Sequence, residues 1–149
     1  MLEADRYKKD VEELLAGLGL SLVELTVSRH RGSTQVRAVI YSPEGTGIDQ
    51  CSKAHRLIMP RLQVLLNEQD FYLEVTSPGV DRWIRSDREY SVFVGRGVRV
   101  LRKGESEWLL GRIVRTGPEA VVIGGSYGEQ TVQYGDIAKA RLDYAQEGV

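Results

Sequence analysis

The chain has 149 residues, of which 42% are apolar and 28% are charged, and its formal net charge is −1. This balance is typical of a folded globular protein and excludes wholesale disorder, and no apolar run approaches the roughly 18 residues that a membrane-spanning helix needs. The single cysteine, Cys51, excludes an internal disulfide and a cysteine-based structural zinc site. Because the first residues are acidic and lack the apolar region of a secretory signal, we expect a cytoplasmic protein.

The first half of the chain has the pattern of an α-β-β-α-β unit. Residues 3–18 carry one apolar stripe at the helical period, which predicts an amphipathic helix. Apolar and polar residues alternate over 23–27 and again over 36–40, which predicts a β-hairpin. Residues 72–76 then predict a third strand.

A second helix is predicted between the hairpin and the third strand. Asp49 is its expected N-cap. Its expected inner face consists of apolar residues at helical spacing: Cys51, Ala54, Ile58, Leu62 and Leu65. Pro60 lies inside this pattern, and because proline lacks an N–H and its ring clashes with the preceding turn, we expect the helix to kink or break near Leu57.

The second half of the chain is predicted to be all strand. Five short strands, separated by glycine or polar turns, are expected at 97–102, 108–115, 119–124, 130–134 and 138–142. So many short strands in about 50 residues favour a small closed barrel of the SH3 or Sm-like kind. The predicted fold class is therefore an α+β N-terminal domain followed by an all-β SH3/Sm-like barrel.

The predicted boundaries follow from these patterns. Residues 1–76 form the N-terminal α/β domain, with a KH-like order of elements. Residues 77–88 form an interdomain linker, because Pro78-Gly79 is a strong β-turn pair. Residues 89–149 form the barrel domain.

Positive charge is concentrated in one part of the second half. Residues 82–103 hold seven Lys and Arg against two Asp and Glu, a local net charge of +5. A local basic patch is what an RNA-facing surface needs, even where the whole chain is nearly neutral. The candidate contacts to RNA or to the ribosome are Arg85, Arg88, Arg96, Arg99, Arg112 and Arg115. Solvated surface charge with no binding role is the alternative reading of the same residues.

One run of residues resembles a known family. After the strand Leu73-Glu74-Val75, the chain reads Ser77-Pro78-Gly79-Val80-Asp81-Arg82. This run resembles the signature of the RimP family of ribosome maturation factors, and the resemblance extends over about residues 7–143. Trp83 stands where that family usually has proline.

The resemblance implies an α/β domain followed by an SH3-like barrel. It also implies a protein that binds the immature small (30S) ribosomal subunit, at a ribosomal protein near the decoding centre and at small-subunit rRNA. On this reading the protein promotes assembly without catalysis and acts as a monomer, with no cofactor, no small-molecule substrate and no membrane partner.

The linker motif consists of Ser77, Pro78, Gly79, Asp81 and Arg82. An aspartate after Pro-Gly can accept backbone N–H bonds and hold a turn, and the arginine fork suits a carboxylate or a phosphate. We expect Asp81 and Arg82 to lock the two domains together, with direct contact to the ribosome as the alternative.

Other candidate sites have simpler explanations. Cys51 and His55 lie one helical turn apart, but two ligands make no structural metal site, so a packed cysteine is favoured. Ser77 has no histidine or lysine near it in the sequence, so no catalytic residue is predicted. Trp83 and Trp108 could stack on bases, but Trp108 begins an apolar strand and is expected to pack in the core or between domains.

The function favoured by these observations is small-subunit maturation by binding. The alternative is a free-standing RNA-binding module of the Sm or KH type, which predicts tight binding to naked RNA. A small hydrolase that uses Ser77 or Asp81 is a further alternative, but it lacks a partner group in the sequence.

Overall fold

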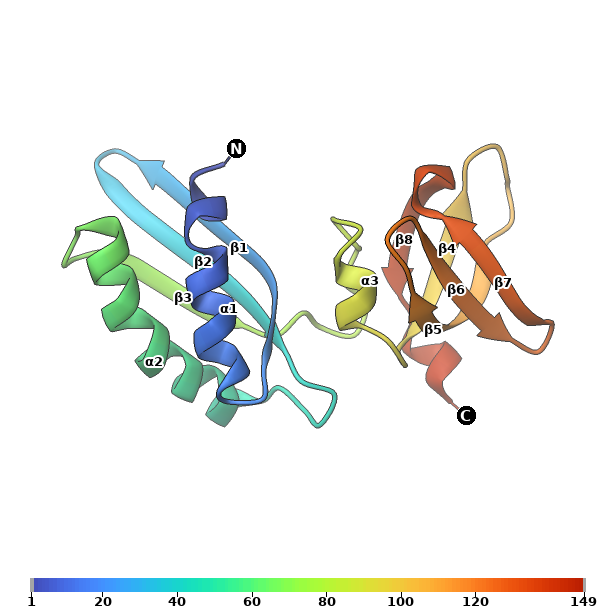
Figure 1. Ribbon diagram of the computed structural model, residues 1–149, viewed down its shortest axis with the longest axis horizontal. Helices are drawn as coiled ribbons and strands as arrows, with labels where there is room; N and C mark the ends of the chain where they lie inside the picture. Colours follow the sequence, from blue (N-terminus) through green and yellow to red (C-terminus); the bar gives the residue numbers. More distant parts are fainter. Residues whose placement is uncertain (1, 149) are drawn as a thin grey trace. The chain divides into compact units, whose positions relative to one another are not determined.

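The computed structural model describes residues 2–148, and these divide into two compact units, the first ending at Pro78 and the second beginning at Gly79 (Figure 1). The predicted linker at 77–88 and the domain limits on either side of it stay predictions. None of the helices in the described part of the chain is both long and apolar enough to cross a membrane.

A three-stranded sheet carries the N-terminal unit. Its strands are β1 (Ser21–His30), β2 (Ser33–Tyr41) and β3 (Tyr72–Thr76), in the order β1-β2-β3. The first two strands pair antiparallel, whereas β3 pairs parallel to β2. Arg31 and Gly32 turn the hairpin with positive φ angles of 52° and 78°, as a tight two-residue hairpin turn requires.

The helices of this unit pack on the sheet through one hydrophobic core (Figure 1). They are the 3-10 helix η1 (Glu3–Arg6), α1 (Lys8–Ala16) and α2 (Ile48–Leu66). Two helices stand where a single helix over 3–18 was expected. The Tyr7 N–H donates to the Ala4 carbonyl at 3.0 Å, and this three-residue spacing is that of a 3-10 turn. Both residues are buried, so the tighter turn places both side chains in the core.

Helix α2 corrects two sequence-based expectations. It continues through Pro60 without a break. Pro60 and Arg56 are exposed, so the backbone carbonyl that the proline leaves unpaired can be hydrated while the buried face of the helix holds its register. The N-cap is Gly47 instead of Asp49, and its N–H donates to Oε1 of Gln50 at 3.0 Å.

An antiparallel sheet of five strands forms the C-terminal unit. After the short helix α3 (Glu89–Val92) come β4 (Gly97–Arg102), β5 (Leu109–Thr116), β6 (Ala120–Gly125), β7 (Gly128–Gln133) and β8 (Ile137–Leu142), with the 3-10 helices η2 (Tyr134–Asp136) and η3 (Tyr144–Glu147). The sheet order is β7-β6-β5-β4-β8. The predicted all-strand domain is thus confirmed as a mostly antiparallel sheet.

No ladder joins β7 to β8 among residues 2–148, so no closed barrel is detected. The free edge of β8 is occupied instead by residues 82–84. The Leu142 N–H donates to the Arg82 carbonyl and the Ile84 N–H donates to the Ala140 carbonyl, both at 2.9 Å. Trp83 and Arg141 therefore lie opposite each other in an antiparallel bridge.

Candidate nucleic-acid interface

The Ser-Pro-Gly-Val-Asp-Arg motif spans the point where one unit ends and the other begins. Ser77 and Pro78 belong to the N-terminal unit, and Gly79 opens the C-terminal unit with a φ of 81°. This left-handed conformation favours glycine. Asp81 is exposed, whereas Arg82 is buried.

Arg82 is held inside the C-terminal unit by a buried carboxylate. Its Nε donates to Oε1 of Glu89 at 2.9 Å and its Nη2 donates to Oε2 at 3.2 Å. The two side chains are only 6% and 1% exposed. The backbone N–H of Arg85 also donates to Glu89, at 3.3 Å. This pair anchors the 82–84 segment to α3, and the expected role of the motif as a lock between domains stays a prediction.

Two of the predicted contact arginines are paired with acids near the end of the chain. Nε of Arg96 lies 2.7 Å from Glu147, and Nη2 of Arg99 lies 3.0 Å from Asp143. Burial opposes ionisation of both acids, but the pKa of Asp143 is lowered by hydrogen bonds from Gln146 and Arg99. The pKa of Glu147 is lowered in the same way by Arg96 and by a backbone N–H. Together with the Gly97 N–H, which donates to Oε2 of Glu147 at 3.0 Å, these pairs hold η3 beside β4.

The other predicted arginines are exposed. Arg115 is 62% exposed and its Nη2 lies 2.9 Å from Oε1 of Glu129, which is also exposed; a surface pair of this kind contributes little. Arg112 donates to the backbone oxygens of Gly95 and Glu147. Arg85 and Arg88 are also exposed. The six residues therefore differ in their surroundings, and only some offer their charge to a partner.

A cluster of two tryptophans and two cations lies on the C-terminal unit. The rings of Trp83 and Trp108 have centroids 6.4 Å apart and are tilted by 51°. Nζ of Lys139 lies 5.7 Å and 5.5 Å from the two ring centroids, and the guanidinium carbon of Arg141 lies 5.3 Å from that of Trp83. Trp83 is 46% exposed, and Trp108 is half-buried instead of sitting in the core.

The sequence contained a partial signal for this cluster. In β8, Ala140 and Leu142 are buried while Lys139 and Arg141 alternate with them, so the period of a strand already places the two cations on one face. The proximity of Trp83 to that face was not predictable, because it depends on the bridge between residues distant in the sequence.

A groove of about 710 Å³ continues from Trp108 across β5 and β6. Aromatic and basic side chains line it, including Trp108, Tyr127, Arg102 and Arg112, with Glu107 as the acid among its lining residues. Tyr127 is 44% exposed, and its hydroxyl donates to the Leu110 carbonyl at 2.8 Å. That bond fixes the ring at the side of the groove.

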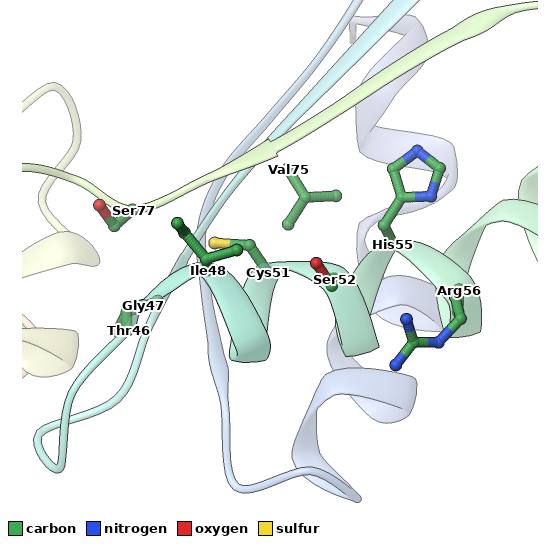
Figure 2. Close-up of a pocket in the computed structure, with 9 residues that line it drawn as sticks. All are labelled: Thr46, Gly47, Ile48, Cys51, Ser52, His55, Arg56, Val75 and Ser77. Carbon is green, nitrogen blue, oxygen red and sulfur yellow. The ribbon is translucent and has the colours of Figure 1, made fainter.

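A second cavity, of about 620 Å³, lies in the N-terminal unit beside the start of α2. Figure 2 shows Ser77 and His55 at opposite sides of it, with Ile48, Cys51 and Val75 between them. Nε2 of His55 is hydrogen-bonded to the Leu73 carbonyl at 3.2 Å. Burial raises the pKa of the Cys51 thiol, which makes it a poor nucleophile, and its side chain packs against the core as expected.

Among residues 2–148, no three His, Cys, Asp or Glu side chains are grouped so that they could hold a metal ion. The cavity beside α2 is lined by Ser77 and His55. In the part of the chain that the structure describes, no hydrogen bond joins these two side chains, and His55 is bonded to the Leu73 carbonyl instead.

Known proteins resemble this chain over both of its units. Residues 10–81 match the family model described as the RimP N-terminal domain. A protein named ribosome maturation factor RimP from Borrelia hermsii (strain HS1 / DAH) is 31% identical over 125 residues, covering 84% of this chain and 85% of that protein. Its namesake from Borrelia garinii subsp. bavariensis is 31% identical over 133 residues, or 89% of this chain and 90% of the relative. The namesake from Borreliella burgdorferi (strain ZS7) is 30% identical over 133 residues, again 89% and 90%.

Proposed function

Because this chain belongs to the RimP family of ribosome maturation factors, we propose that it binds the immature small ribosomal subunit and promotes its assembly without catalysing a reaction. The observation that carries this proposal is similarity over both units, which extends well beyond the residues of the signature motif. A role in ribosome maturation is what the names of the relatives state; the small subunit as the target is our proposal.

The proposed mechanism is binding with different affinity for two states of the particle. A factor that binds an immature conformation more tightly shifts the population toward that conformation, and it leaves when maturation removes its contacts. We propose that the protein acts as a monomer in the cytoplasm and touches small-subunit rRNA and a ribosomal protein near the decoding centre. We propose that the C-terminal unit corresponds to the small SH3-like barrel of the family. Its five antiparallel strands support this proposal.

The basic residues of the C-terminal unit are the proposed contacts. Arg85, Arg88, Arg112 and Arg115 are exposed, so their charge can neutralise phosphates. Arg96 and Arg99 also belong to the proposed surface, although their ion pairs with Glu147 and Asp143 support a structural role as well.

Co-sedimentation in a salt series tests the proposal. The purified protein is mixed with immature small subunits, mature small subunits, large subunits and assembled ribosomes. We expect binding confined to small subunits, stronger for immature ones and weaker as salt rises, because phosphate contacts release counterions. Equal binding to all particles would overturn the proposal. Binding to free RNA alone would instead favour a free-standing RNA-binding module.

A further inference from the structure

We propose that the tryptophan pair and the adjoining groove bind an unpaired stretch of RNA, with bases stacked on the aromatic rings and phosphates held by the neighbouring cations. The inference deepens the proposed function and rests on it for one point only, that the RNA in the cell is small-subunit rRNA. Below, "the aromatic surface" means Trp83, Trp108, Tyr127, Lys139 and Arg141.

The rings of this surface are placed where bases can reach them. Trp83 and Tyr127 are 46% and 44% exposed, and Trp108 lies 6.4 Å from Trp83 while also lining the groove that Tyr127 borders. A large aromatic ring left in contact with water forfeits the free energy of its own burial. Three such rings along one path thus form a stacking platform of the kind that single-stranded nucleic acids use.

The positions of Trp83 and Tyr127 are fixed by the fold. Backbone bonds on either side of Trp83 attach residues 82–84 to β8, and the buried pair of Arg82 with Glu89 holds the residue just before it. The Tyr127 hydroxyl is bonded to the Leu110 carbonyl. A platform that is rigid before binding loses little conformational entropy when a ligand arrives.

The positive charges of Lys139 and Arg141 are available to a phosphate. Among the described residues, no ion pair joins Lys139 or Arg141 to a carboxylate, in contrast to Arg96 and Arg99. The Nε atoms of Arg141 and of Arg102, which lines the groove, are buried without a hydrogen-bond partner. Lys139 lies over both tryptophan rings, so a base stacked at this pair brings its phosphate close to an ammonium group.

The combination of rings and cations favours unpaired RNA over other anions. In a duplex the base faces are covered by neighbouring base pairs, so the rings would have nothing to stack on. An acidic peptide could pair with Lys139 and Arg141, but its carboxylates would leave the aromatic faces unused. Unpaired nucleotides use both features at once, and every base has a face to stack.

Binding of octauridylate to the full-length protein tests this inference. Both tryptophans of the chain belong to the aromatic surface, so stacking should quench the intrinsic fluorescence directly, and anisotropy of labelled octauridylate gives the affinity. Trp83→Ala should weaken binding by about fivefold or more, the effect of losing one base–aromatic stack. Trp83→Phe should retain most of the affinity because a ring remains.

Two further variants separate stacking from unspecific effects. Tyr72→Ala removes a 61% exposed ring from β3 in the N-terminal unit and should leave octauridylate binding unchanged. Glu107→Gln removes the acid from the groove lining and should tighten binding, because a like charge beside the phosphates is lost.

Three outcomes would overturn the inference: equal affinity of Trp83→Ala and the parent protein, equal binding of a blunt RNA duplex, or displacement of octauridylate by polyglutamate. These results are separable from failure of the proposed function. If the parent protein co-sediments with immature small subunits but neither binds nor is quenched by octauridylate, only the inference fails. If octauridylate binding follows the expected pattern while small subunits are not bound, the proposed function fails and the site remains.

Discussion

Arg82 and Glu89 form a buried ion pair with two hydrogen bonds between side chains that are almost completely enclosed. Removing one member of such a pair leaves the other charge buried without its partner. We therefore expect Arg82→Ala to destabilise the C-terminal unit by about 3–5 kcal/mol. Urea unfolding followed by tryptophan fluorescence measures this unit specifically, because Trp83 and Trp108 both lie within it.

Arg115→Ala is the matched control for Arg82→Ala. Arg115 and Glu129 are 62% and 49% exposed, so their pair should contribute no more than about 1 kcal/mol. Similar losses for Arg82→Ala and Arg115→Ala would contradict the structural role assigned to the buried pair.

Among the helices and strands, α2 carries an internal proline that it tolerates at some cost. Replacing Pro60 by Ala restores an N–H donor for the Arg56 carbonyl and removes the ring. We expect Pro60→Ala to stabilise the N-terminal unit by about 1–3 kcal/mol, since proline is about 3 kcal/mol less favourable than alanine inside a helix. The measurement is urea unfolding followed by the helix signal in far-UV circular dichroism.

Lys53→Ala serves as the control for α2, because it alters an exposed position of the same helix without changing the backbone bonds. Its effect should stay within about 0.5 kcal/mol. If Pro60→Ala instead lowers the free energy of unfolding, packing of the proline ring must contribute more to stability than the helix hydrogen bond that the proline prevents.

The attachment of η3 to β4 makes the C-terminal unit sensitive to acid. The pKa values of Asp143 and Glu147 are lowered in the folded protein from ordinary values of 3.8 and 4.5. A lowered pKa stabilises the fold above the ordinary value, and this stabilisation disappears as pH falls through the folded value. Asp143→Asn should therefore be less stable than the parent protein near neutral pH, and the difference should shrink below the ordinary pKa.

Urea midpoints measured by tryptophan fluorescence across an acid series test this expectation. A difference between parent and Asp143→Asn that stays constant from neutral to acid pH would show that the pair with Arg99 contributes through packing alone.

For the molecule as a whole, the net charge of −1 conceals an uneven distribution of free and paired cations. We expect Lys139→Gln to reduce the slope of log affinity against log salt for small-subunit binding by about 0.7, because one phosphate contact to an unpaired strand is lost. Arg96→Gln should change the slope less than Lys139→Gln does, because Glu147 already balances part of the Arg96 charge, and it should also lower stability. Co-sedimentation at several salt concentrations measures both slopes; the reverse ranking would assign the phosphate contacts to the paired arginines.

Much of the fold was predictable because its patterns are local. The period of 3.6 identified the buried face of α2, and the period of 2 identified the strands of both units. The prediction of a break at Pro60 was wrong because it considered the helix alone. Burial of Ala54, Ile58 and Leu62 stabilises the helix through its packing, and tertiary packing routinely overrides local propensity.

The candidate interface was less predictable because its character depends on pairing. The basic run from Arg82 to Lys103 was visible in the sequence, but the acids that pair with Arg96 and Arg99 lie 51 and 44 residues away. Nothing in the local pattern distinguishes a paired arginine from a free one. Stacking of bases on Trp83 and Trp108 was one reading of the sequence, but their meeting with Lys139 and Arg141 was not predictable, since Trp83 reaches these cations only through the bridge to β8.

Patterns along the chain were enough to predict the order of the main helices and strands and, through the motif that ends at Arg82, the family. Each of these depends on residues that are neighbours along the chain. Only the folded chain shows that Arg82 is a buried partner of Glu89, that residues 82–84 occupy the edge of β8, and that two tryptophans meet two cations at the surface. Charge pairing and exposure are properties of contacts between distant segments, and such contacts exist only once the chain has folded.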